Sequence, residues 1–210
     1  THPTVEERTT LLTADYSQIE MRIMAHMSGD EGLIQAYQDG EDLHRFVGSQ
    51  VFEVEPEDVT TSMRDKVKAM SYGLAYGLSS FGLSRQLRVS VDEARELMSS
   101  YFDRFGDVQR YLRNVVRQAR KDGYTQTMLG RRRYLPDLQS DNRQLREMAE
   151  RAALNAPIQG SAADLIKVAM LGVQARLEQQ QLHSRMILQV HDELILEVVD
   201  SEVEAAEAIL

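Results

Sequence analysis

A run of cations and phenols recurs at every fourth residue in the segment 64–77: Arg64, Lys68, Tyr72 and Tyr76. If the segment is a helix, these side chains share one stripe about 18 Å long. Cations bind phosphate oxygens and phenol rings stack on bases, so the stripe could hold a polyphosphate joined to a base. A solvated amphipathic helix with half-buried tyrosines is the alternative, and in both cases Val67, Met70, Ser71 and Leu74 are expected to pack inward.

Two carboxylates stand at the ends of apolar runs. Asp15 follows Thr9–Ala14, which predicts a short buried strand, and Asp192 lies between two apolar runs that predict a hairpin. If these strands share a sheet, the two acids meet at one edge and repel each other unless a cation lies between them. Carboxylate oxygens suit Mg²⁺, and a pair of Mg²⁺ ions can drive phosphoryl transfer. Each Asp is also a common turn residue, so a purely structural role remains open.

The remaining periodicities predict an α+β chain with many short helices and few antiparallel strands. Pro157 is expected to break or kink a helical region, and Ser17 with Glu20 forms a potential capping box. Helices are predicted over 17–27, 31–38, 41–52, 61–77, 79–87, from 90 and from 106 to about 122, over 140–155 and 162–179, and from 201; strands are predicted over 9–14, 124–128, 186–190 and 194–199.

Composition narrows the class of protein. The chain has 210 residues, 42% of them hydrophobic and 27% charged, which is ordinary for a soluble globular protein. It contains no cysteine, which excludes disulfides and thiolate metal sites, and neither a signal-peptide pattern nor a membrane-spanning run is expected. The net charge is −9, but the segment 103–151 has 12 Lys/Arg against 7 Asp/Glu. This local excess predicts a polyanion site, although ordinary fluctuation would also produce it.

Four segments resemble, in order, the signature motifs of family A DNA polymerases, the bacterial DNA polymerase I type. They are DYSQIEMR from Asp15, the Arg64–Gly77 stripe, ERAALNAPIQG from Glu150, and QVHDE from Gln189. The similarity runs from about Leu11 to the end of the chain, and the sequence resembles actinobacterial members. One difference is Tyr72, where most bacterial members have Phe; the added hydroxyl is expected to lower discrimination against dideoxynucleotides.

The resemblance implies a fold, an activity and partners. It implies an antiparallel palm sheet with helices over 1–28 and 146–210, and largely helical fingers over 29–145 with a nucleotide-binding helix at 61–77, the thumb and nuclease domains being absent. It also implies template-directed DNA synthesis from dNTPs on a primer-template, with two Mg²⁺ ions, by a monomer in the bacterial cytoplasm at the nucleoid. A DNA-binding but inactive remnant and a two-metal nuclease are the alternatives.

By the same resemblance, the metal ligands would be Asp15, Asp192 and the Tyr16 carbonyl. Glu193 would support this site, or would be a solvated charge at the hairpin tip. Lys68 could protonate the leaving pyrophosphate, since a cation held against phosphate is also a proton donor.

The resemblance further implies nucleotide contacts. The triphosphate would bind Arg64, Lys68 and His44, although a lone His is otherwise usually a helix surface residue. Tyr72 and Tyr76 would pack against the sugar and the new base pair. Glu20 would act as a steric gate against a ribose 2′-hydroxyl or only complete a capping box, and Gln18 would lie near the nucleotide.

DNA contacts complete the set of implied roles. Arg151, Asn155 and Gln159 share a helix face if Pro157 only kinks the helix, and they resemble residues that touch primer and template. Donors placed there can test base-pair geometry without reading sequence, because minor-groove acceptors look alike for all correct pairs. His191 would approach the primer terminus. The run Arg131–Arg133 either contacts phosphate or is solvated.

Overall fold

The computed structural model describes residues 8–40 and 42–210, and its chain divides into two compact units. Unit 1 comprises the chain up to Ile19 and from Ala162 onward, and unit 2 comprises 20–161. These boundaries differ from the predicted palm and fingers boundaries, and the assignment of those two names stays a prediction. Glu41, the predicted start of one helix, and most of the predicted N-terminal palm tail, residues 1–7, lie outside the described residues.

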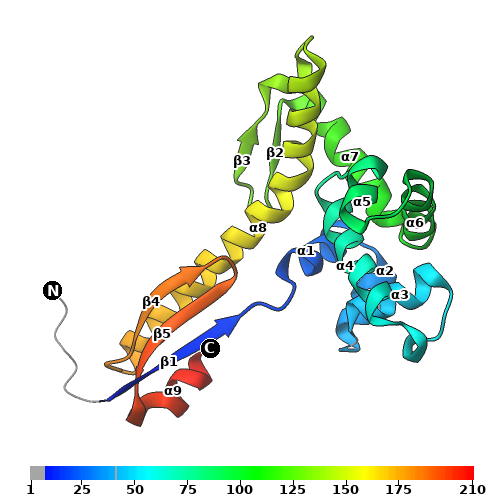
Figure 1. Ribbon diagram of the computed structural model, residues 1–210. Helices are drawn as coiled ribbons and strands as arrows, with labels where there is room; N and C mark the ends of the chain where they lie inside the picture. The colour runs from blue at the N-terminus through cyan, green and yellow to red at the C-terminus, as the bar shows by residue number, and fades with distance from the viewer. Residues whose placement is uncertain (1–7, 41) are drawn as a thin grey trace. The chain divides into compact units, whose positions relative to one another are not determined.

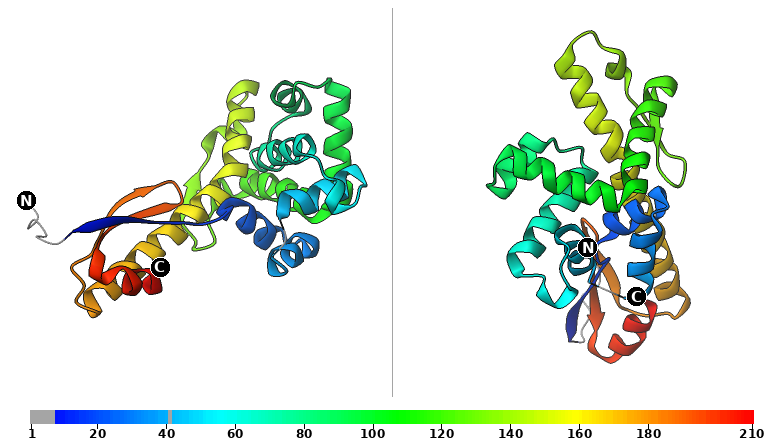
Figure 2. Two further views of the ribbon diagram at one scale, coloured as in Figure 1. Left: turned by 60° about the horizontal axis from the view of Figure 1, so that its bottom comes forward. Right: turned by 90° about the vertical axis from the view of Figure 1, so that its right-hand side faces the viewer.

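Unit 1 is built on a three-stranded antiparallel sheet in the order β1-β5-β4. Its strands are β1 (Thr9–Asp15), β4 (Arg185–Val190) and β5 (Glu193–Val199), and β1 pairs with β5 from Thr9 opposite Val199 to Asp15 opposite Glu193. Figure 1 labels the strands, and in Figure 2 helix α9 (Val203–Ile209) and the end of α8 lie on one side of the sheet. Alternate residues of β5 fill the interface with these helices, namely Leu194, Leu196 and Val198.

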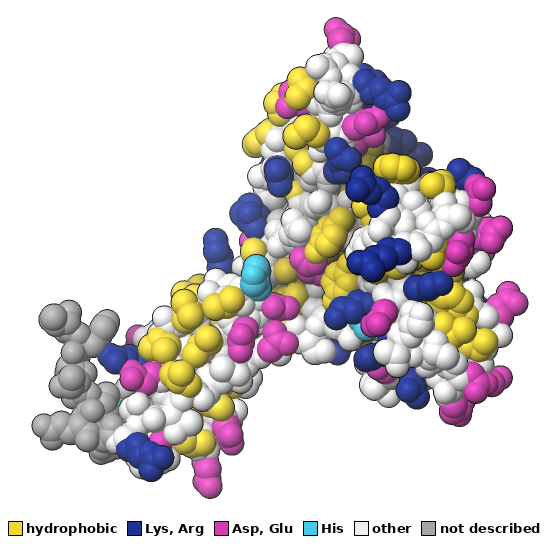
Figure 3. Space-filling model, viewed as in Figure 1, with side chains coloured by type: hydrophobic (Ala, Val, Ile, Leu, Met, Phe, Trp, Pro, Cys, Tyr) yellow, Lys and Arg dark blue, Asp and Glu magenta, His cyan; other side chains and the backbone are white. Residues whose placement is uncertain are grey.

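The prediction that β1 is a buried strand is wrong. β1 lies at the edge of the sheet, and only one of its faces is turned to the helices, so Leu11 on the other face is 64% exposed. Leu188 and Val190 of β4 are also exposed, and Figure 3 shows hydrophobic side chains gathered over this part of unit 1. An antiparallel sheet can leave one face open in this way, whereas the sequence pattern reads only as apolar.

Unit 2 is helical through most of its length. A cap explains several helix starts, because Asp30, Asp42, Thr60, Ser79 and Ser90 each accept a backbone N–H of the first turn with their side chains. The helices are α1 (Ile19–Ser28), α2 (Glu31–Gln38), α3 (Leu43–Phe52), α4 (Thr61–Ala75), α5 (Ser80–Leu87), α6 (Val91–Arg104) and α7 (Gly106–Asp122), with a 3₁₀ turn η1 at Pro56–Asp58.

Helix α1 begins two residues later than predicted. Its first residue is Ile19, and the residue directly before it is Gln18, whose φ of 55° is left-handed. The capping roles of Ser17 and Glu20 stay predictions.

Helix α8 (Arg143–Gln179) is continuous, and Pro157 lies inside it. The two helices predicted on either side of Pro157 are one, although proline removes a helical hydrogen bond at a cost of about 3 kcal/mol. Packing offsets that cost, because Pro157 is buried and Ile158 is fully buried. Within unit 2 the helix is flanked by a short hairpin of β2 (Tyr124–Gln126) and β3 (Arg132–Tyr134) and by the turn η2 (Pro136–Gln139).

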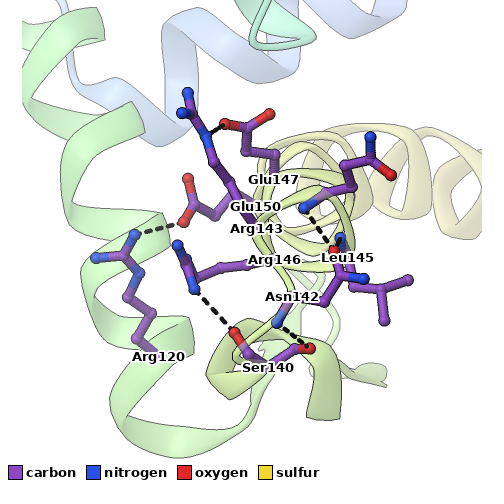
Figure 4. Close-up of polar contacts among 9 residues, drawn as sticks. Arg120, Ser140, Asn142, Arg143, Leu145, Arg146, Glu147 and Glu150 are labelled. Carbon is purple, nitrogen blue, oxygen red and sulfur yellow. Dashed lines mark hydrogen bonds and ion pairs between the residues drawn. The ribbon is translucent and has the colours of Figure 1, made fainter.

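The start of α8 is fastened to α7 and η2 by polar contacts, drawn in Figure 4. The Arg120 guanidinium of α7 pairs with the Glu150 carboxylate of α8, and Arg146 donates to the Ser140 carbonyl at 2.8 Å. Beneath these contacts lies a small apolar cluster: Ala119, Leu135, Leu138, Ala149 and Ala153. Among the residues that the structure describes, no helix is long and apolar enough to cross a bilayer.

Candidate active site

The structure brings Asp15 and Asp192 together in unit 1. Asp15 is the last residue of β1, and the Tyr16 N–H, one residue later, donates to the Asp192 carbonyl at 3.1 Å. The pKa of the Asp15 carboxyl is raised by desolvation, then by the charges of Asp192 and Glu193, and by a hydrogen bond between the Asp15 and Asp192 carboxyls. In Figure 3, acidic side chains and a histidine gather at this end of the sheet.

The turn that carries Asp192 has an uncommon backbone. β4 and β5 are joined by only His191 and Asp192, and His191 has a φ of 54°, in the left-handed region that favours glycine. The Gln189 side-chain amide donates to the His191 carbonyl at 2.5 Å across this turn. A non-glycine residue adopts this left-handed backbone conformation only at a cost in free energy, and the hydrogen bond helps to hold it. It thereby restrains the backbone directly before Asp192.

The donor set at this end of the sheet fits a hard divalent cation. Two carboxyls in mutual contact disfavour each other's ionised form, and a cation between them removes that penalty. The carboxylates and the Tyr16 carbonyl are oxygen donors of the kind Mg²⁺ binds. Across the described part of the chain, no group of three or more His, Cys, Asp or Glu side chains is arranged around a common metal position, so water or substrate oxygens would have to complete the shell.

The predicted nucleotide stripe lies on α4 in unit 2. Arg64 and Lys68 are exposed and Tyr72 is partly buried. The helix ends at Ala75, so Tyr76 is its C-cap rather than a helical residue, and Gly77 follows with a φ of 68°. The opposite face is buried as expected: Val67, Met70, Ser71 and Leu74.

Arg64 is held by Asp42. Its guanidinium lies 2.7 Å from an Asp42 carboxylate oxygen, and the other carboxylate oxygen accepts the His44 N–H at 3.0 Å. Burial alone would raise the pKa of Asp42, but the hydrogen bond from Arg64 and those from the α3 backbone keep it below its ordinary value. One carboxylate therefore ties the start of α3 to the start of α4.

His44 is a buried residue, not the helix surface residue that its isolated sequence context favours. It is 5% exposed, and its ring centroid lies 6.4 Å from that of Tyr72. Desolvation lowers the pKa of His44, since the raising effect of Asp42 is opposed by the nearby charges of Arg64 and Lys68. Its Nδ1 atom is buried with no hydrogen-bond partner among the described residues. His44, Arg64 and Tyr72 thus form one neighbourhood in unit 2.

Glu20 contacts the end of the stripe. The Tyr76 hydroxyl donates a hydrogen bond to the Glu20 carboxylate. Burial and this hydrogen bond raise the pKa of Tyr76 to about 12, while a hydrogen bond from the Gln159 side chain acts in the opposite direction. Glu20, Tyr76 and Gln159 therefore meet within unit 2, although they come from three distant positions in the sequence.

The predicted DNA-contacting residues lie on one unbroken helix. Arg151, Asn155 and Gln159 all belong to α8, so Pro157 does not interrupt their shared face. Arg151 and Gln159 are exposed, whereas the Asn155 side-chain oxygen is buried without a hydrogen-bond partner in the described ranges.

The chain matches the family model "DNA polymerase family A" over residues 3–210. The chain belongs to this family. It is 66% identical over 200 residues to DNA polymerase I of Mycobacterium tuberculosis strain H37Rv and 47% identical over 194 residues to that of Geobacillus stearothermophilus, matches that cover 95% and 92% of this chain. The chain spans 22% of the length of both relatives.

A solved structure gives the same result. It is described as the "POL domain of Pol1 from M. smegmatis complex with DNA primer-template and dNTP"; it superposes with a TM-score of 0.93 at 62% identity, covering 97% of this chain and 36% of that one. The predicted membership of family A and the resemblance to actinobacterial members are thereby confirmed.

The predicted site residues of this family A chain fall into two groups. In unit 1 lie Asp15, Tyr16, Gln18, His191, Asp192 and Glu193; in unit 2 lie Glu20, His44, Arg64, Lys68, Tyr72, Tyr76, Arg151, Asn155 and Gln159. Their roles stay predictions. Sequence reasoning gave no role to Asp42 or Gln189, although an Asp directly before a helix predicts an N-cap and Gln189 is the first residue of the QVHDE motif.

Proposed function

We propose that this chain is part of the catalytic core of a DNA-directed DNA polymerase, which adds dNTPs to a primer 3′-hydroxyl on a DNA template. The observation that carries the proposal is that strand pairing brings Asp15 and Asp192 to one end of the sheet in a family A chain, where the Tyr16 N–H donates to the Asp192 carbonyl at 3.1 Å. A 62% identical relative is described in complex with primer-template and dNTP, which supports these partners. The proposal includes a monomer, a palm and fingers arrangement, and the bacterial cytoplasm at the nucleoid as its location.

Asp15, Asp192 and the Tyr16 carbonyl are the proposed ligands of two Mg²⁺ ions. When bound, such ions lower the pKa of the attacking hydroxyl and neutralise charge on the triphosphate. Asp15 needs to be ionised for this role. Desolvation first, and then the charges of Asp192 and Glu193, raise its pKa, and a bound cation would favour the ionised form. Glu193 lies opposite Asp15 across the β1–β5 pair and adds negative charge at the same end of the sheet.

The triphosphate is proposed to bind Arg64, Lys68 and His44. Arg64 is oriented by Asp42, and its planar guanidinium can donate two hydrogen bonds to phosphate oxygens. Lys68 is exposed and one turn further along α4, where its ammonium can give a proton to the leaving pyrophosphate. His44 is favoured in its neutral form, so it can donate one hydrogen bond without adding a charge.

Sugar and base selection are proposed for Tyr72, Tyr76, Glu20 and Gln18. The Glu20 carboxylate is fixed by the Tyr76 hydroxyl, and a fixed side chain can exclude a ribose 2′-hydroxyl where a mobile one would yield. Tyr72 keeps an accessible part of its ring beside His44 for packing against the sugar. Gln18 lies two residues before Glu20, near the start of α1.

Primer and template contacts are proposed for Arg151, Asn155, Gln159 and His191. The first three are donors on one helix face, suited to the acceptors that every correct base pair presents in the minor groove. The hydrogen bond between Gln159 and Tyr76 places one of these donors beside a proposed nucleotide contact. His191 is exposed at the β4–β5 turn, next to Asp192.

A primer-extension reaction with one dNTP and Mg²⁺ tests the proposal. Elongation of the primer supports polymerase activity, shortening supports a two-metal nuclease, and binding with neither supports an inactive remnant. Asp192→Ala should abolish elongation while DNA affinity stays within about twofold, because the carboxyl contributes chemistry rather than grip.

Asp141→Ala is the matched control, since it removes an exposed carboxylate that has no proposed role. It should extend at the wild-type rate. Elongation that survives Asp192→Ala would remove Asp192 from the reaction.

A further inference from the structure

The hairpin β2–β3 presents an unusual outer face. Tyr124 pairs with Tyr134 and Gln126 pairs with Arg132, so these four side chains project from the same face of the two strands. We call this face the Tyr–Arg ribbon. Thr125, between them on β2, points to the other face and is buried, which leaves the ribbon as the outward side.

The ribbon brings together two rings, tilted by 58° to each other, and a cation. The Tyr124 and Tyr134 ring centroids are 5.7 Å apart, and the Arg132 guanidinium lies 4.4 Å from the centre of the Tyr124 ring. Tyr134 is 69% exposed and Arg132 is exposed. Because most of the Tyr134 side chain is exposed, packing within the described structure does not explain why a tyrosine stands at this position.

The hairpin itself carries charge of one sign. Residues 124–134 include three arginines and no acidic residue, although Asp122 lines the same pocket as Tyr124 and Gln126. Figure 3 shows Lys and Arg side chains along the edge of the molecule where Figure 1 places β3. Aromatic faces together with an excess of positive charge suit a polyanion that also offers flat rings.

The hairpin that carries the ribbon is fastened to α8, and Arg131 and Arg132 differ in their contacts. The Arg131 guanidinium donates to the Gly160 carbonyl of α8 at 2.9 Å, and the Met128 N–H donates to the Ser161 hydroxyl at 2.9 Å. A Cβ at Gly160 would lie only 2.6 Å from the Thr127 side chain, so the hairpin packs closely on the helix. Arg131 therefore fastens the hairpin, while Arg132 faces outward.

We propose that the Tyr–Arg ribbon binds a single-stranded segment of DNA, with bases on the tyrosine rings and a phosphate on Arg132. This inference rests on the proposed function, in which the unpaired part of the template is the single-stranded DNA that would be present. Strands of three residues present only a short surface with two tyrosine rings, which suits one or two unstacked bases better than a duplex. The hairpin that carries the ribbon contacts α8 at Gly160, next to Gln159, and so lies in the same unit as the proposed DNA contacts of α8.

Binding of a fluorescent oligo-dT of about 20 nucleotides to the whole chain, followed by anisotropy over a range of salt concentrations, tests the proposal. Tyr134→Ala should weaken binding about fivefold or more, because a stacked base is lost, and should leave the salt dependence unchanged. Tyr134→Phe keeps the ring and should bind like wild type, which separates stacking from misfolding.

Arg132→Ala should flatten the plot of log affinity against log salt by about 0.7, the contribution of one phosphate contact on a single strand. Arg113→Ala is its matched control: it removes an exposed arginine on α7 and should leave the slope unchanged. An equal change of slope in both variants would mean that only net charge matters and would overturn the assignment.

Three other outcomes would also overturn it. They are wild-type binding by Tyr134→Ala, equal weakening on a blunt duplex of the same length, and displacement of oligo-dT by polyglutamate at equal charge concentration. Primer extension on the same variants separates the two proposals. If the wild type extends primers and the ribbon variants bind oligo-dT normally, the proposed role of the ribbon is wrong and the proposed polymerase function stands. If binding depends on the ribbon but the wild type extends no primer, the role of the ribbon stands and the proposed function is wrong.

Discussion

The Asp42 carboxylate makes two different interactions. It caps α3 through the His44 and Arg45 N–H groups, and it pairs with Arg64 of α4. A cap is worth about 0.5–2 kcal/mol, and a partly exposed ion pair only about 0.2–1 kcal/mol. The cap is therefore the larger effect on stability, while the ion pair decides where the Arg64 guanidinium lies.

Two substitutions separate the helix cap from the ion pair. Asp42→Asn keeps a capping oxygen and should lower the free energy of unfolding at pH 7 by at most about 1 kcal/mol, whereas Asp42→Ala should cost roughly 1–2 kcal/mol more. Because the folded pKa of Asp42 lies below its ordinary value, the ion-pair contribution is present above pH ~4 and is lost as the pH falls through the folded pKa. Urea unfolding at several pH values measures this.

The gap between wild type and Asp42→Asn should therefore close in acid, while the gap between Asn and Ala persists. Asp39→Asn is a control, because Asp39 is exposed and its carboxylate accepts a hydrogen bond from the Gln35 side-chain amide of α2, which carries no charge. A gap between wild type and Asp42→Asn that stayed constant down to pH ~2 would show that the ion pair contributes nothing.

The junction of α4 and α8 depends on Gly77. Its φ of 68° is left-handed, and a Cβ there would lie 2.6 Å from the Leu154 Cδ1 atom of α8. Gly77→Ala therefore incurs backbone strain and requires the end of the Leu154 side chain to move, and it should destabilise unit 2 by about 1–3 kcal/mol.

Gly29→Ala supplies the matched measurement. Gly29 has nearly the same φ, 67°, but a Cβ there would meet no other side chain within 4 Å, so this variant should show only the backbone cost of about 1–2 kcal/mol. In a double variant, Leu154→Ala should recover part of the loss in Gly77→Ala, because it removes the clashing atom. Equal losses in Gly29→Ala and Gly77→Ala, by thermal or urea unfolding, would contradict the steric account.

Local elements could be predicted from the sequence, and distant contacts could not. The helix predicted from residue 90 is confirmed, because its start is determined within four residues: the Glu93 N–H donates to the Ser90 hydroxyl at 3.1 Å. The continuity of α8 through Pro157 depends on burial, which no local pattern reports. The exposure of β1 depends on its place at the sheet edge, a property of topology.

The site divides in the same way. The apolar runs predicted that Asp15 and Asp192 stand at the ends of strands, but their proximity depends on pairing strands from opposite ends of the chain. The Tyr76–Glu20 hydrogen bond and the Arg64–Asp42 pair have no signal in the sequence alone, because each joins residues on different helices or beyond a helix end. Resemblance to a family gives roles to residues, whereas these contacts need the fold.

At the scale of the whole molecule, the chain has two compact units and passes between them twice, within α1 and within α8. Unit 1 packs a three-stranded sheet on two helices and leaves one sheet face open, while unit 2 buries a larger set of helices around residues such as Leu33 and Val67. Small units bury a smaller fraction of their surface than large ones, so unit 1 should be the less stable of the two. Local opening would then expose β1, β4 and β5 before the helices of unit 2.

Hydrogen exchange on matched core variants tests this. Leu196→Ala removes a fully buried side chain from β5 and should cost about 2–5 kcal/mol, and Leu33→Ala makes the same change in α2. If the cores open separately, Leu196→Ala should speed amide exchange in the three strands of unit 1 while the amides of α2, α3 and α6 keep wild-type rates. Leu33→Ala should speed exchange in those helices. Uniform acceleration over both units by either variant would show that the two units form one cooperative structure.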